Sequence, residues 1–308
     1  MRRAVIALSA IALLASPAQA KKTDKTPRTI VMTAFAPEWE SLVHLVARPR
    51  EHRINGLTFL TGEMAGKPVL LMQSGVSMVN AAMNTQLALD RFTIKRIVFS
   101  GIAGGVDPSL SIGDVVVPAG WAQYLEVSFA RQTANGWITP EPVDEIAPPN
   151  YGMMFPRGVR MGNAAEPVRR HYDFAVDPKL LDLARTVAAR VTLRRCVEAR
   201  APAATPPACL AEAPKIVVGG TGVSAGVFAD NAEFRTYLFG AWKARVLDME
   251  SAAVQQVAYA NGVPAIAFRS LSDLAGGDAG ENQMNTFMTL AAVNSAEVVR
   301  AFVAALPD

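Results

Sequence analysis

The 308-residue sequence has few of the side chains that bind transition metals. It contains two cysteines, Cys196 and Cys209, and three histidines, His44, His52 and His171. No two histidines stand at helical or hairpin spacing with cysteines or acids, as a zinc site requires. We therefore expect no metal ion and no other cofactor.

An excess of charge of one sign is also missing. The chain carries 30 Lys and Arg against 27 Asp and Glu. Two of the arginines, Arg2 and Arg3, lie in the first 20 residues, so the remaining chain is within one charge of neutrality. A near-neutral protein has no electrostatic reason to bind nucleic acid or an anionic membrane surface. We expect neither as a partner.

Apolar runs long enough to cross a bilayer are absent. The run Ala4–Ala15 has only 12 residues, follows two arginines and precedes Ala18-Gln19-Ala20. A basic start, a short apolar core and small residues at the end are typical of a secretory signal peptide. We predict a signal peptide over residues 1–20 with cleavage after Ala20, and a periplasmic or secreted protein. An uncleaved N-terminal anchor is the alternative.

The predicted periplasmic or secreted location affects the expected redox state of the two cysteines. Cys196 and Cys209 are separated by an Ala/Pro-rich stretch. An oxidising compartment favours a disulfide between them. Two free thiols are the alternative.

Strand-length apolar runs alternate with helical patterns along the chain. This order predicts an α/β fold: one three-layer α/β/α domain with a central mixed, mostly parallel twisted sheet. We place this domain at residues 28–306, with Pro- and Gly-rich or Ala/Pro-rich insertions at about 131–170 and 196–214. The predicted strands are 29–34, 57–61, 67–73, 96–100, 114–119, 215–219, 245–249 and 265–271, and the predicted helices are 38–46, 79–92, 178–191, 229–239, 252–261 and 285–305.

Three acidic residues follow predicted strands, where sites form in such sheets. They are Glu38, Glu250 and Asp273. Glycine-rich loops are predicted at 101–105 and 220–226, where backbone amides can approach a ligand closely. Cleavage of a glycosidic bond needs an acid for the leaving group, a carboxylate that activates water and an acceptor for sugar hydroxyls. The three carboxylates are suited to these tasks.

Three motifs carry a family resemblance. They are the stretch 100–117 (SGIAGGVDPSLSIGDVVV), the helix start 247–253 (LDMESAA) and the strand end 269–273 (RSLSD). Their order and spacing resemble the nucleoside phosphorylase/nucleosidase superfamily, and most closely its 5′-methylthioadenosine/S-adenosylhomocysteine nucleosidases. The resemblance extends over about residues 28–306, apart from the two insertions. It implies hydrolysis of the N-glycosidic bond of a purine nucleoside, and a homodimer.

The resemblance also implies catalytic roles. Asp273 would donate a proton to purine N7, and Ser272 would orient its carboxyl group. Glu38 would hold and deprotonate the attacking water. Pro37 departs from the acidic pattern that the family shows before this residue, and Glu40 is a nearby rival.

The substrate-binding residues follow in the same way. Glu250 would accept from the 2′- and 3′-hydroxyls of ribose, with Met249 packed under the sugar. A segment over residues 222–228 is interpreted as a loop above the purine. Phe35 and Met284 are candidates for an apolar 5′ pocket. The remaining candidate contacts to the base or water are Ile102, Ala103, Gly104, Ser224, Ala225 and Phe228.

Two alternative functions stay open. Phosphorylases of this superfamily hold phosphate with arginines near the first turn and before the glycine-rich loop, positions without arginine here. A phosphate dianion needs such partners in a closed pocket, so water is the expected nucleophile. Arg131, Arg157 or Arg160 of the first insertion could still supply them. A non-catalytic exported protein that binds or takes up nucleosides is the second alternative.

Overall fold

The computed structural model describes residues 22–196 and 209–307. The predicted signal peptide at 1–20 and the interior of the second insertion, 197–208, lie outside the described residues.

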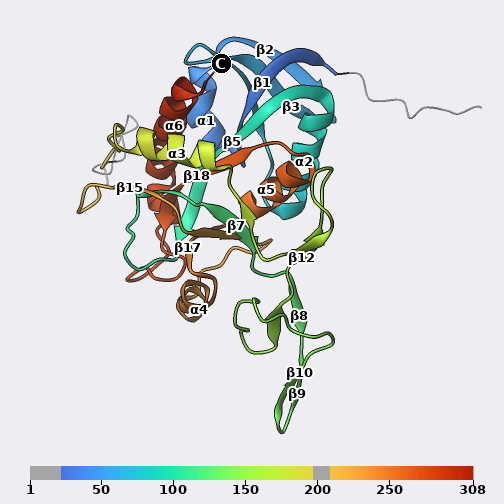
Figure 1. Cartoon of the computed structure of the whole chain (residues 1–308). Helices are drawn as coiled ribbons and strands as arrows, with labels where there is room; N and C mark the ends of the chain where they lie inside the picture. The colour runs from blue at the N-terminus through green and yellow to red at the C-terminus, as the bar shows by residue number, and fades with distance from the viewer. Residues whose placement is uncertain (1–21, 197–208, 308) are drawn as a thin grey trace, which may run out of the picture.

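A twelve-stranded mixed sheet forms the centre of the molecule (Figure 1). Its main path runs β14-β7-β16-β17-β5-β1-β4-β3-β2, while β18 pairs with β5, β6 with β18, and β15 with β6. β1 is parallel to β4 and β5, and β18 is parallel to β5, whereas β17 is antiparallel to β5. The strands are β1 (Asp24–Thr33), β2 (Ala47–Ile54), β3 (Leu57–Met64), β4 (Lys67–Gln73), β5 (Phe92–Gly105), β6 (Val115–Val117), β7 (Gly120–Gln123), β14 (Phe174–Ala175), β15 (Ile216–Val218), β16 (Thr221–Ser224), β17 (Ala244–Asp248) and β18 (Ala265–Asp273).

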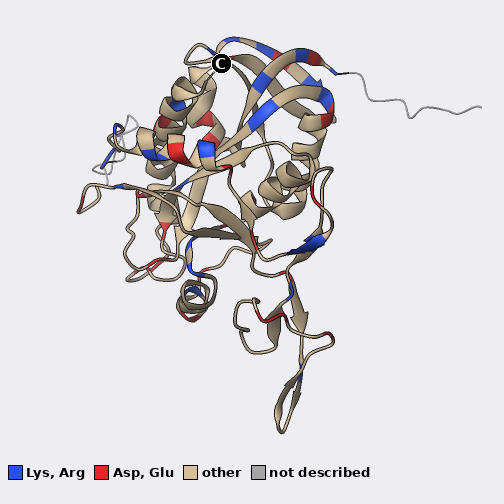
Figure 2. Cartoon of the chain, viewed as in Figure 1, with Lys and Arg blue, Asp and Glu red and all other residues tan. Residues whose placement is uncertain are grey.

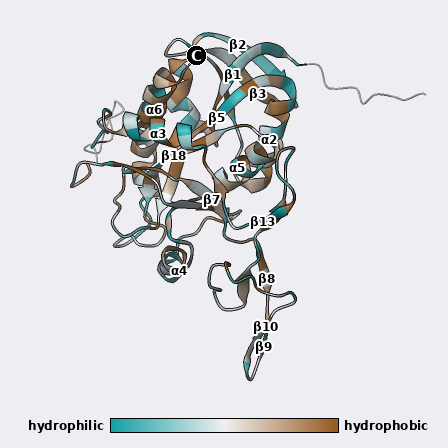
Figure 3. Ribbon diagram, in the orientation of Figure 1, coloured by the Kyte–Doolittle hydropathy of each residue, from teal (hydrophilic) through white to brown (hydrophobic). Residues whose placement is uncertain are grey.

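Helices cover both sides of the sheet, so the predicted three-layer α/β/α class is confirmed. α6 packs on β18 and β5, with α1 and α3 beside it, and α2 packs with α5 on the other side (Figure 1). Figure 3 shows the brown, apolar stretches concentrated where these helices meet the sheet. The helices are α1 (Ala36–Leu42), α2 (Met78–Arg91), α3 (Pro178–Ala188), α4 (Ala232–Trp242), α5 (Ser251–Ala260) and α6 (Met284–Ala305), with a 3-10 turn η1 (Val43–Leu45).

α6 is apolar because it is a core helix. Within the described residues it is the one helix whose length and hydropathy would suffice to cross a membrane. More than half of its most apolar window, 56%, is buried inside the protein.

The central strands are buried on both faces, as expected for strands between two helical layers. In β1, the residues from Thr29 to Thr33 are all buried. All nine residues of β18 are buried, although four of them, Arg269, Ser270, Ser272 and Asp273, are polar or charged. Ser272 and Asp273 line the candidate site described below, whereas the Ser270 hydroxyl donates to the Gly113 carbonyl oxygen.

The first insertion forms an arm outside the sheet. After β7 the chain builds three short antiparallel pairs before it returns at β14 (Figure 1). Tyr151 anchors this arm because its ring contacts Phe234 and Tyr237 of α4 at centroid distances of 5.1 and 5.0 Å. The arm contains β8 (Val127–Phe129), β9 (Arg131–Thr133), β10 (Gly136–Ile138), β11 (Met154–Pro156), β12 (Val159–Met161) and β13 (Arg169–His171).

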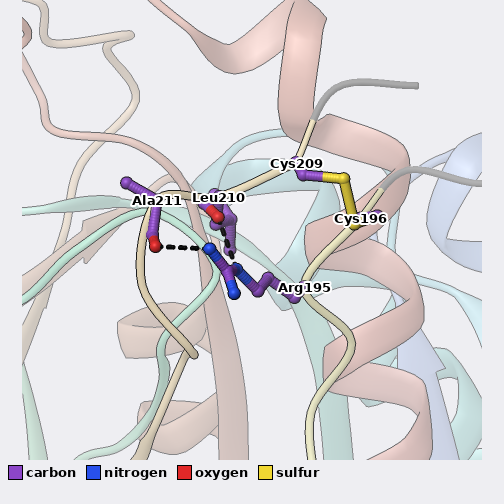
Figure 4. Close-up of a disulfide and its surroundings, with 5 residues drawn as sticks. All are labelled: Arg195, Cys196, Cys209, Leu210 and Ala211. Atoms are coloured by element: carbon purple, nitrogen blue, oxygen red, sulfur yellow. Dashed lines mark hydrogen bonds between the residues drawn. A yellow bond between two sulfur atoms is a disulfide. The ribbon is translucent and has the colours of Figure 1, made fainter. Parts of the chain in front are cut away.

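The predicted disulfide is present at the base of the second insertion. Cys196 and Cys209 are bonded to each other (Figure 4). Beside the bridge, the Arg195 guanidinium donates to the carbonyl oxygens of Leu210 and Ala211 at 2.7 and 2.6 Å. The bridge and this arginine hold the two ends of the insertion together.

The structure differs from the sequence prediction at an edge strand and at an expected loop, among other places. β2 was not predicted, because its sequence ARPREHRI lacks an apolar face; it is an exposed edge strand whose arginines are visible in Figure 2. Charged side chains on an edge strand prevent pairing with other chains. The expected loop at 220–226 is also wrong, because Thr221–Ser224 is strand β16. Gly222 serves packing there, since a Cβ atom would lie 2.6 Å from the Trp121 ring.

Candidate active site

A cavity of about 220 Å³ lies where several strands end. The three predicted carboxylates, from three separate elements, all line it. The full set of lining residues is Ala34, Phe35, Glu38, Val76, Ile102, Ala103, Gly104, Val227, Phe228, Ala229, Leu247, Asp248, Met249, Glu250, Ser272, Asp273 and Met284. Apart from its acids and Ser272, this lining is almost wholly apolar.

Glu38 enters the cavity from the first turn of α1. Its Oε2 accepts a hydrogen bond from the Ala34 amide at 2.6 Å, and its Oε1 accepts from the Ile102 amide at 2.8 Å. Burial raises the pKa of Glu38, and the nearby Arg269 guanidinium opposes that rise. Pro37 is compatible with the site because proline is favoured in a first helical turn. Glu40, the rival acid, is exposed and does not line the cavity.

Asp273 is the last residue of β18 and faces the same cavity. Its Oδ1 accepts from the Ala275 amide at 2.9 Å, and the Ser272 hydroxyl donates to its Oδ2 at 3.0 Å. Burial raises the pKa of Asp273, while these two donors partly offset the rise. Ser272 therefore touches the carboxyl group that it was expected to orient.

Glu250 follows β17 and precedes the first turn of α5. Its Oε1 accepts from the Ser77 amide at 2.8 Å. Burial, reinforced by the neighbouring Asp248 carboxylate, raises the pKa of Glu250 to about 7. Met249 lines the cavity next to it.

Arg269 is the residue that sequence reasoning missed. It is 0% exposed and lies 3.8 Å from Glu38 Oε1, 2.7 Å from Asp248 Oδ2 and 3.8 Å from Glu250 Oε2. Its guanidinium carbon stands 4.0 Å above the Phe99 ring. One signal was available: an arginine inside the apolar strand AIAFRSL must be paired, because a lone buried charge is strongly unfavourable.

The predicted glycine-rich turn at 101–105 is the end of strand β5. Its glycines make room for charged groups. A Cβ atom on Gly101 would lie 1.7 Å from Arg269 Nη1 and 2.7 Å from Glu38 Oε1. One on Gly104 would lie 3.0 Å from Asp273 Oδ1. Ile102, Ala103 and Gly104 line the cavity.

Two of the residues expected to contact the base, Ser224 and Ala225, lie away from the cavity. Ser224 is 0% exposed at the end of β16, where its hydroxyl donates to Asp248, and Ala225 is buried in the apolar cluster beneath. Neither lines the cavity, because the strand continues where a loop was expected. Phe228, three residues beyond Ala225, lines it with Val227. Among the described residues no group of His, Cys, Asp and Glu is arranged to hold a metal ion.

The chain belongs to the Phosphorylase superfamily, whose family model matches residues 28–304. It is 28% identical over 269 residues to the 5′-methylthioadenosine/S-adenosylhomocysteine nucleosidase of Mycobacterium tuberculosis, which covers 87% of this chain and 94% of that relative. The enzyme of the same name from Marinomonas sp. is 30% identical over 251 residues, which are 82% of this chain and 87% of that relative. The family inferred from the three motifs is thereby confirmed.

Solved structures show the same fold. The 5′-methylthioadenosine/S-adenosylhomocysteine nucleosidase of Neisseria meningitidis, in complex with methylthio-immucillin-A, superposes with a TM-score of 0.66 at 23% identity. The match covers 91% of this chain and all of that chain.

The contact between Gly101 and the buried charges predicts the effect of one methyl group. Gly101→Ala should lower the free energy of unfolding by about 3 kcal/mol, because the new Cβ atom would separate Arg269 from its partners. Gly240→Ala is the matched control: Gly240 is exposed in α4 with nothing within 4 Å, so this change should be neutral or stabilising. Chemical denaturation measures both, and equal stability of the two variants would contradict the prediction.

Proposed function

We propose that this chain hydrolyses the N-glycosidic bond of purine nucleosides that carry an apolar 5′ group, such as 5′-methylthioadenosine. The observation that carries the proposal is the convergence of Glu38, Glu250 and Asp273 on one largely apolar cavity. The names of the relatives, which are 5′-methylthioadenosine/S-adenosylhomocysteine nucleosidases, support the same activity.

Asp273 acts as the general acid. Its raised pKa keeps a larger fraction of the carboxyl group protonated as the pH approaches neutrality, so it can donate to purine N7 as the base leaves. Activity is then lost as the pH rises through that pKa. The Ser272 hydroxyl and the Ala275 amide, which donate to Oδ2 and Oδ1, hold this carboxyl group in one orientation.

Glu38 acts as the base for water and Glu250 binds the sugar. The Ala34 and Ile102 amides hold the Glu38 carboxylate in one orientation, so its remaining lone pairs can accept from a water molecule. Glu250 has one oxygen on the Ser77 amide and accepts from ribose hydroxyls. Both carboxylates also stabilise the positive charge that develops on the sugar ring in the transition state.

Water is favoured over phosphate by the charge of the site. Among the described residues that line the cavity, none is Lys or Arg. Arg269 is wholly buried behind the acids and ion-paired to Asp248. Of the arginines in the first insertion, Arg131 and Arg160 lie on β9 and β12, and Arg157 pairs with Glu141 at 3.0 Å. A phosphate dianion would meet several acids and no exposed cation there.

The apolar side chains of the cavity lining favour an uncharged 5′ group. Phe35, Val76 and Met284 line the cavity, as do Val227 and Phe228. Phe35 and Met284 are the two residues suggested by sequence for this role. A methylthio group would be transferred from water to apolar surface, whereas a 5′-phosphate would have to leave its hydration shell without a cation.

The activity is tested with purified protein lacking residues 1–20. Methylthioadenosine, adenosine and inosine are incubated with and without phosphate, and products are separated by chromatography. We expect free adenine and methylthioribose from methylthioadenosine without phosphate. Asp273→Asn should lower kcat by about 100-fold or more, because general acid catalysis is lost.

Two other outcomes of this experiment would support the alternative functions. A sugar 1-phosphate that appears only with phosphate would show a phosphorylase. Tight binding of a nucleoside without any product would show the non-catalytic binding protein.

We also propose that the chain forms a homodimer through the rim of this site. Val79 and Met83, one helical turn apart on α2, are 69% and 58% exposed, and Phe228 at the cavity mouth is 54% exposed. Apolar side chains gathered beside a cavity are typical of a protein contact. Light scattering after size exclusion should give twice the chain mass, and Met83→Glu should shift it towards the monomer. A wild-type monomer at micromolar concentration would contradict the dimer.

Export is the remaining proposal. The disulfide between Cys196 and Cys209 supports an oxidising location. Protein recovered from the periplasm or medium of a host that expresses the full chain should have an intact mass lacking residues 1–20 and two hydrogens. Retention of residues 1–20 in the membrane fraction would indicate the uncleaved anchor instead.

A further inference from the structure

Asp248 is a buried carboxylate that the proposed reaction does not use directly. It is the last residue of β17 and precedes Met249 and Glu250. Its Oδ1 accepts from the Ser224 hydroxyl at 2.5 Å and from the amides of Glu250 and Ser251, both at 3.1 Å. Its Oδ2 lies 2.7 Å from Arg269 Nε. One side chain therefore connects two strands, a helix start and the buried guanidinium.

Ser224 completes the start of α5. While it donates to Asp248, its oxygen accepts from the Ala252 amide at 2.9 Å. Three successive amides, those of residues 250, 251 and 252, thus end on Asp248 and Ser224. Free amides at a helix start must be satisfied, and the residue before the helix ordinarily does this with its own side chain.

Glu250 occupies that N-cap position but makes no capping bond within the described structure. Its carboxylate instead accepts from the Ser77 amide and lines the cavity. Because Asp248 and Ser224 satisfy the helix start, the Glu250 side chain is available to the site.

Asp248 also sets the orientation of Arg269. It contacts Nε on one edge of the guanidinium, and the Ser251 hydroxyl accepts from Nε and Nη2 at 3.0 and 2.9 Å. The terminal nitrogens are then directed to Glu38 and Glu250, each at 3.8 Å. The planar guanidinium cannot shift towards one acid without leaving another.

We propose that Asp248 and Ser224 form a positioning pair that holds Glu250 and Arg269 in the geometry required for hydrolysis. This inference rests on the proposed function of the cavity. Ser224 does not line the cavity. Asp248 does line it, but its oxygens are occupied by the Ser224 hydroxyl, two amides and Arg269, so it acts through Glu250 and Arg269 rather than on substrate.

The charges around Asp248 and Ser224 influence the pKa of Glu250, so changing Asp248 should alter the pH dependence of activity. Asp248 is faced by Arg269 from β18, by Ser224 from β16, and by Tyr124, which follows β7; Glu38 of α1 lies beyond Arg269. Burial and the Asp248 carboxylate raise the pKa of Glu250, and Arg269 opposes them. Removing the Asp248 charge takes away a like charge and frees Arg269 to attract Glu250. Both changes lower the pKa of Glu250.

Asp248→Asn is the direct test. The asparagine oxygen can still accept from the helix amides, but its charge is lost and its NH₂ group opposes Arg269 Nε. We expect kcat/KM for methylthioadenosine to fall by about 10- to 100-fold through misplaced groups. The acid limb of the pH profile, expected near the Glu250 pKa of about 7, should move to lower pH. Asp248→Glu keeps the charge and should recover part of the activity and the original acid limb.

The Ser224→Ala variant tests the contribution of Ser224 separately from that of Asp248. It removes the hydrogen bond that Ser224 donates to Asp248 and the one that it accepts from the Ala252 amide, and it leaves the Asp248–Arg269 pair intact. KM should rise more than kcat falls, because Glu250 binds the sugar hydroxyls and Glu38 is not displaced.

Asp107→Asn is the matched control. Asp107 is also buried, pairs with Arg245 at 3.1 Å and accepts from the Ser109 amide at 2.8 Å, but neither Asp107 nor Arg245 lines the cavity. It should leave KM and the pH profile unchanged even if the melting temperature falls. A merely structural Asp248 would behave like Asp107, with lost stability and an unmoved acid limb, and that result would overturn the proposal.

Crystal structures separate this inference from the proposed function. If wild-type protein binds methylthioadenosine without hydrolysis, the function is wrong, and calorimetric affinity for that nucleoside replaces KM in the comparison. If wild-type protein does neither, the structure of the Asp248→Asn variant decides. Displaced Glu250 and Arg269 side chains would support the positioning pair, and unmoved ones would contradict it.

Discussion

A single buried guanidinium holds the acidic site together. Glu38, Asp248 and Glu250 come from α1, β17 and the start of α5, and each would repel the others in an apolar surrounding. Arg269 lies within 3.8 Å of all three and is the cation that lets them share a cavity. Removing one partner of such a group leaves an unpaired charge, which is far more unfavourable than losing a surface ion pair.

The backbone around Arg269 is adapted to this charge. Gly101 on β5 leaves the space that the guanidinium occupies, and the Phe99 ring lies beneath it. Arg269 is not the only group that stabilises these carboxylates. The amides of Ala34 and Ile102 donate hydrogen bonds to Glu38, and the Ser77 amide donates one to Glu250. Burial still raises the pKa values of Glu38, Glu250 and Asp273. Raised values are what acid–base chemistry near neutral pH requires.

Much of this site could be predicted from sequence because acids that directly follow buried strands tend to line sites at the edge of such a sheet. Glu38, Glu250 and Asp273 were each recognised as acids that follow an apolar run, and all three line the cavity. Ser224 was misplaced because a glycine-rich stretch resembles a loop; Gly222 is instead a packing residue beneath Trp121. β2 was missed because an edge strand in water needs no apolar pattern.

The sequence by itself determined the α/β class, the family and the three cavity acids, and it favoured the pairing of Cys196 with Cys209. These depend on local periodicity, on ordered motifs and on having only two cysteines. Only the tertiary structure decided that Arg269 joins the acids and that Asp248 and Ser224 support Glu250. Those contacts bring together residues from strands that are far apart in the chain, and their distances depend on sheet register and helix packing, which no local pattern specifies.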